Sequence, residues 1–95
     1  MAEKATKGRR LKSAVFQVRS QPWTIILSPR NLKNRGECDY GQNAIRLCRG
    51  TADLRDTLIH EVLHAALPDL AEEAVVETAA AIDSALEAVE DWDIL

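Results

Sequence analysis

Pro68 constrains the fold of this chain more than any other residue, because it separates two segments that are both expected to be helices. Residues 52–67 contain neither Gly nor Pro, and Thr51 before them is a typical N-cap residue. Asp69 follows the proline and has Glu72 three residues later, which is the form of a capping box. We therefore predict a second helix over about residues 70–90, joined to the first as an antiparallel αα-hairpin.

The part of the chain before residue 50 has the pattern of strands. Short runs rich in β-branched and aromatic residues alternate with turn residues, over residues 14–18, 23–27, 37–40 and 44–48. Because the strands precede the helices, we predict the α+β class, with a small antiparallel or mixed sheet of three or four strands followed by the helical hairpin. A chain of 95 residues has room for one domain, which we predict over residues 1–95.

Charge is divided unequally along the chain, although the formal net charge is only −3. Residues 1–55 hold all 12 Lys and Arg together with four acids, and residues 56–95 hold the other 11 acids. We favour the interpretation that two oppositely charged halves of one domain attract each other. Residues 1–10 are predicted to form a mobile basic arm, and the alternative interpretation of the charge is that this arm contacts nucleic acid, which makes nucleic acid a possible partner.

Composition and cysteine usage exclude several classes of protein. The hydrophobic content of 46% argues against a disordered chain. There is no apolar run long enough for a membrane helix and no secretory signal at residues 1–10, so we expect a cytoplasmic protein without a membrane partner. Two cysteines, Cys38 and Cys48, are too few for a disulfide framework. They could be cross-strand neighbours in one hairpin, but free thiols are favoured in a reducing cytoplasm.

The two histidines of the chain, His60 and His64, are four residues apart in the first predicted helix, and Glu61 follows the first of them. This is an H-E-x-x-H motif. Residues i and i+4 lie one turn apart on the same helix face, so both imidazoles can reach one metal ion. Glu61 lies on the same polar edge, within reach of a water molecule on that ion. We predict a zinc site with Glu61 as its catalytic base; structural histidines are the alternative.

A catalytic zinc site needs a third protein ligand, and the acids of the second predicted helix are the candidates. If the corner is centred between Pro68 and Asp69, antiparallel helices place Glu73 opposite His64 and Glu77 opposite His60. We therefore predict Glu73 as the third ligand and Glu77 as the carboxylate that orients His60. The reverse assignment of these two acids stays open, and Glu72 is assigned to the helix cap.

Two segments resemble a known family of enzymes: TLIHEVLHAAL at residues 57–67 and EEAVVE at residues 72–77. Together they resemble the zincin metallopeptidases of the gluzincin type, in which an E-x-x-x-D/E segment supplies the third zinc ligand and a supporting acid. The small size and the hairpin over residues 36–48 are similar to the minimal zincins of bacteriophages, in the ImmA/IrrE and SprT-like groups. The resemblance implies a zinc cofactor and a phage protein in the host-cell cytoplasm.

These features together predict a zinc metallopeptidase in which Glu61 accepts a proton from the attacking water. We expect the strand over residues 44–48 to pair with an extended peptide or protein substrate. Tyr40 is a candidate for stabilising the transition state, with a packed hairpin residue as the competing interpretation. The alternative function is a zinc-stabilised regulatory or DNA-binding module without catalysis, or an inactive zincin. The presence of Glu61 favours the enzyme, because a purely structural zinc site has no use for it.

Overall fold

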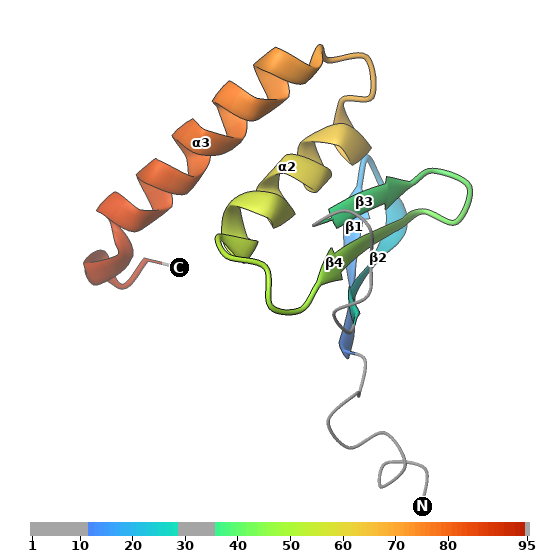
Figure 1. Cartoon of the computed structure of the whole chain (residues 1–95), viewed down its shortest axis with the longest axis horizontal. Coiled ribbons are helices and arrows are strands. Elements are labelled where there is room, and N and C mark those ends of the chain that lie inside the picture. Colours follow the sequence, from blue (N-terminus) through green and yellow to red (C-terminus); the bar gives the residue numbers. More distant parts are fainter. Residues whose placement is uncertain (1–11, 29–35, 95) are drawn as a thin grey trace, which may run out of the picture.

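A four-stranded sheet is followed by two helices in the computed structural model, which describes residues 12–28 and 36–94 (Figure 1). The α+β class and the order of sheet and helical hairpin are therefore confirmed. The predicted basic arm over residues 1–10 lies outside the described residues. The elements in chain order are β1 (Lys12–Val18), β2 (Gln21–Ser28), β3 (Gly36–Asp39), β4 (Ala44–Cys48), α2 (Leu54–Ala66), α3 (Glu72–Ala88) and a short 3-10 helix, η1 (Glu90–Trp92).

The sheet is mixed, with the strand order β1-β2-β4-β3. β1 and β2 form an antiparallel hairpin whose turn residues, Arg19 and Ser20, both have positive φ, as a tight two-residue turn requires. β4 pairs in parallel with β2 and antiparallel with β3. The prediction that residues 44–48 accept a substrate strand is therefore wrong, because β4 has a strand on each side. Among the described residues, β3 pairs with β4 alone and forms an edge of the sheet.

The hydrophobic core lies between the sheet and α2. Ile45 and Leu47 are buried on β4 and belong to the same cluster as Ala65 of α2, with Leu58 and Val62 packed against it. Arg46, between the two core residues of β4, extends to the other face of the sheet, as strand alternation requires. α2 lies between the sheet and α3, and it contacts both β3 and β4 (Figure 1). The core thus holds α2 against β3 and β4.

Both helices begin about two residues later than predicted, and neither predicted cap forms. Asp53, in a left-handed conformation, precedes α2, and no side chain caps that helix. α3 begins at Glu72 after Ala71, again without a side-chain cap, so Asp69 and Glu72 do not form a capping box. The connection therefore covers residues 67–71 and is longer than the tight corner expected at Pro68. In the described part of the chain, neither helix has the length and apolar character needed to cross a membrane.

The two cysteines are not joined by a disulfide, and they lie at different positions of the β3–β4 hairpin. Cys38 lies opposite Ile45 in the strand register, so it is not the cross-strand neighbour of Cys48. The alternative of a cross-strand disulfide is therefore incompatible with the register.

Candidate metal centre

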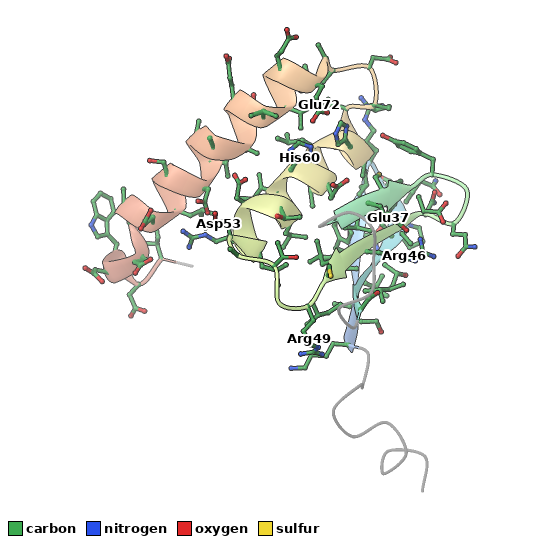
Figure 2. The ribbon with its side chains drawn as sticks, viewed as in Figure 1. Glu37, Arg46, Arg49, Asp53, His60 and Glu72 are labelled. Carbon is green, nitrogen blue, oxygen red and sulfur yellow. The ribbon has the colours of Figure 1, made fainter. Side chains whose placement is uncertain are left out.

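Three side chains from the two helices converge at the end of the helical hairpin nearest the connection. The Nε2 atoms of His60 and His64 are 3.2 Å apart. One carboxylate oxygen of Glu72 lies 3.2 Å from Nε2 of His60, and the other lies 3.0 Å from Nε2 of His64. Figure 2 shows Glu72 at the start of α3, extending towards His60 on α2. One ligand atom from each residue lies within 4.8 Å of the other two.

The spacing of these atoms fits a small cation. Zinc bound tetrahedrally at about 2.0–2.1 Å from nitrogen and oxygen ligands places neighbouring ligand atoms about 3.3 Å apart. The two Nε2 atoms are 3.2 Å apart, close to that value, while each is approached by a different oxygen of Glu72, so for one donor atom from each residue the separations are within 4.8 Å. Two imidazoles and one carboxylate are also the ligand set of many catalytic zinc sites, in which a fourth position is left for water or substrate. The donor atoms are therefore of the kinds that bind zinc, and they lie close enough together to hold a metal ion.

The prediction for the third ligand has to be corrected, because the structure brings Glu72 to the histidines and not Glu73 or Glu77. Val75 and Ala79 are the buried residues of α3, and they form the face that packs on α2. Glu72 precedes them by three and seven residues, so it shares that face. All three acids are exposed, but Glu73 and Glu77 lie on another side of the helix. The spacing of Glu72 from Val75 and Ala79 was the sequence signal that could have identified it.

Glu61 lies beside the three converging residues but is not one of them. It is 8% exposed, and it faces the edge strand, where its Cγ lies close to Gly36. Burial raises the pKa of the Glu61 carboxyl, and positive charge on His60 or His64 acts in the opposite direction. A carboxylate whose pKa is raised towards neutrality is a better proton acceptor than a solvated one. Its position and its surroundings suit it to act as a base.

Tyr40 connects the β3–β4 hairpin to α2 through the backbone of His64. Its hydroxyl donates a hydrogen bond of 2.7 Å to the carbonyl oxygen of His64. Its ring packs edge-on against Trp23, with the ring centroids 6.0 Å apart. The hydroxyl is therefore directed to the main chain of the helix, which favours the interpretation of Tyr40 as a packed hairpin residue over a role in stabilising the transition state.

Comparison of the chain with protein families, with curated proteins and with solved structures found no match. The functional argument therefore rests on the residues and on their geometry.

Proposed function

We propose that the protein is a zinc-dependent metallopeptidase. The observation that carries this proposal is the convergence of His60, His64 and Glu72, with the buried carboxyl of Glu61 next to them and outside the ligand group. A site that only stabilises the fold needs the ligands alone, preferably four of them. Three ligands together with an adjacent base are the requirement of metal-assisted hydrolysis.

Each residue has a separate part in the proposed reaction. His60, His64 and Glu72 hold the ion, which when bound lowers the pKa of water and polarises the carbonyl of the scissile peptide bond. Glu61 accepts the proton of the attacking water and passes it to the amine that leaves. Glu61 can serve both transfers because it lies next to the ligand residues without being one of them.

The proposed substrate is an extended peptide or protein segment paired with β3. This strand has one partner among the described residues, so its other side can accept the backbone of an added strand. β3 also contacts α2, the helix that carries both histidines and Glu61. A peptide added to β3 would therefore run next to the proposed metal site. The sequence predicts substrate pairing for β4, but β4 already has a strand on each side, so the proposal assigns substrate pairing to β3.

The proposed relationship to the gluzincins depends mainly on H-E-x-x-H. If Glu72 is the third ligand, the position four residues later is Val76, which is apolar and about half exposed. The E-x-x-x-D/E pattern was matched by Glu73 and Glu77, and neither contacts the histidines in the described structure. The proposal is therefore a zincin whose third ligand stands one residue earlier than the family pattern implies.

The Glu61→Gln variant tests the enzymatic part of the proposal. Glutamine keeps the size of the side chain and removes its ability to accept a proton. Zinc content should stay near that of the wild type, and peptide cleavage should fall by about 100-fold or more, since general-base catalysis is worth about 10²–10⁴-fold. Cleavage would be followed by mass spectrometry on a mixture of unstructured peptides, with Glu73→Gln as a matched control on an exposed acid.

Either of two results would contradict the proposal that the protein is an enzyme. If zinc-loaded wild type cleaves no peptide, or if Glu61→Gln cleaves as fast as wild type, the metallopeptidase proposal fails. Zinc binding that persists in either case would favour the zinc-stabilised regulatory module instead.

A further inference from the structure

Gly36 lies where the edge strand comes closest to the helix of the H-E-x-x-H motif. A Cβ atom built on Gly36 would be 2.8 Å from Cγ2 of Thr57 and 3.3 Å from Cγ of Glu61. The first distance is too short for two carbon atoms, so no side chain fits between β3 and α2 without a shift of one of them. Gly36 does not have the positive φ that Gly50 has, so this close approach is what requires glycine.

Thr57 cannot easily turn away from a side chain at position 36. It is 9% exposed, and its hydroxyl donates a hydrogen bond of 3.2 Å to the backbone carbonyl of Asp53. That bond holds the χ1 angle of Thr57 and directs its methyl group towards β3. A methyl group added at Gly36 would therefore push the strand and the helix apart.

We propose that Gly36 is a positioning residue that sets the distance between the edge strand and Glu61. The absence of a side chain lets β3 lie directly against α2, so that a peptide paired with β3 is presented to Glu61 and to the His60–His64–Glu72 group. This proposal rests on the proposed function, in which β3 binds the substrate and Glu61 is the base. A displacement of the order of 1 Å at such a site can cost about 100-fold in rate.

The chain offers both a rescue and a control for this proposal. Gly36→Ala adds the methyl group, and Thr57→Ser removes the methyl group that it would meet while keeping the hydroxyl that bonds to Asp53. The double variant Gly36→Ala/Thr57→Ser should therefore restore most of the wild-type spacing, because the 3.3 Å contact that remains with Cγ of Glu61 needs a shift of only a few tenths of an ångström. Gly41→Ala is the matched control, because a Cβ there would have only an ordinary contact, 3.4 Å from the Asp39 carboxylate.

A first readout that does not depend on activity is the alkylation of Cys38. Cys38 is two residues after Gly36, so it lies on the same face of β3, and it packs against the core below α2. Gly36→Ala should open this contact and speed the alkylation of Cys38 by about tenfold or more, from loss of burial. The double variant and Gly41→Ala should react at the wild-type rate. Mass spectrometry separates Cys38 from Cys48, and all variants are compared at one pH because burial raises the pKa of Cys38.

The second readout is peptide cleavage by the zinc-loaded variants, at a temperature at which circular dichroism shows all of them folded. Gly36→Ala should lower kcat by about 10–100-fold, because the distance between Glu61 and the scissile peptide bond of a substrate on β3 would change. Zinc affinity should change little, since the metal ligands all lie on α2 and α3. The double variant should recover most of the lost kcat, and Gly41→Ala should resemble the wild type.

As long as the variants fold, three outcomes would overturn the proposal. They are unchanged alkylation of Cys38 in Gly36→Ala, unchanged kcat in that variant despite faster alkylation, and a kcat that Thr57→Ser does not rescue. Failure of the proposed function looks different, because zinc-loaded wild type would then cleave no peptide while the alkylation of Cys38 still followed the Gly36 and Thr57 substitutions. Loss of folding in Gly36→Ala that Thr57→Ser repairs would assign Gly36 to stability and would also overturn a positioning role.

Discussion

The two ends of the α2–α3 pair are joined by side chains of different chemistry. At the end far from the connection, Nε of Arg55 lies 2.5 Å from a carboxylate oxygen of Asp83, and a second contact of 3.5 Å joins Nη2 of Arg55 to the backbone carbonyl of Asp83. At the end near the connection, Glu72 meets His60 and His64. The contact between Arg55 and Asp83 is an ion pair, and its hydrogen bond raises the pKa of Arg55 above the usual value for arginine.

The difference between the two ends lies in the source of the positive charge. Arginine always carries its own charge, so the Arg55–Asp83 pair is complete without any added ion. Histidine carries no fixed charge, and a neutral imidazole presents a lone pair to a cation. Two imidazoles and a carboxylate thus form a group that an added cation can complete. The same helix pair is held at one end by its own residues, and at the other it presents a group that could hold a metal ion.

The largest expected effect is the loss of metal binding at the histidine end alone. Each of His60→Ala and His64→Ala removes one of three ligands, and zinc affinity should fall by more than about 100-fold, since even a residue behind a ligand is worth about 10–100-fold. Arg55→Ala should keep zinc. Competition with a chromophoric chelator measures the affinity.

Zinc at 100 times Kd should also stabilise the wild type by about 2.7 kcal/mol, and chelation should remove this gain. The site would be refuted if purified wild type contained no zinc and its melting temperature did not change when a chelator was added.

A second prediction sharpens the assignment within the histidine end. Glu72→Ala should strip the metal, while Glu73→Ala and Glu77→Ala should leave zinc content close to that of the wild type, because those two acids lie on a side of α3 that does not face the histidines. The three substitutions remove the same chemical group from one helix, so they control for each other. Metal analysis of the purified variants decides the question. Zinc lost in Glu73→Ala and kept in Glu72→Ala would show that the helices pair in the register first predicted from the sequence.

The smallest effect is expected at the arginine end. The side chains of Arg55 and Asp83 are 45% and 28% exposed, and an ion pair this open is screened by solvent. Asp83→Asn should therefore lower the free energy of unfolding by at most about 1 kcal/mol, and by less at high salt. Urea denaturation of the metal-free protein measures the change. A loss of several kcal/mol, or a loss of zinc binding, would mean that this pair supports the metal end far more than its exposure indicates.

The elements of the fold were predictable because local patterns carry them. Short runs of β-branched and aromatic residues, separated by turn residues, identified all four strands. Pro68 marked the break between the helices. The ends of the helices were less accurate, because Thr51 and Asp69 are good capping residues that the tertiary structure does not use. Strand order was missed as well. β4 reads as a strand from its own residues, but its position inside the sheet depends on its parallel pairing with β2, which is distant in sequence.

The sequence by itself determined the chemistry of the candidate site on α2. His60, Glu61 and His64 are placed by the period of one helix, so their relation needs no other part of the chain. Only the tertiary structure decided what meets them. The five-residue connection and the packing of Val75 and Ala79 on α2 turn Glu72 towards the histidines in place of Glu73. The sheet order puts β3 at the edge, and at Gly36 this strand approaches Thr57 and Glu61 so closely that a Cβ atom would not fit without a shift. The physical reason is that spacing within a helix is local, whereas register between helices and strands is set by packing over long sequence separations.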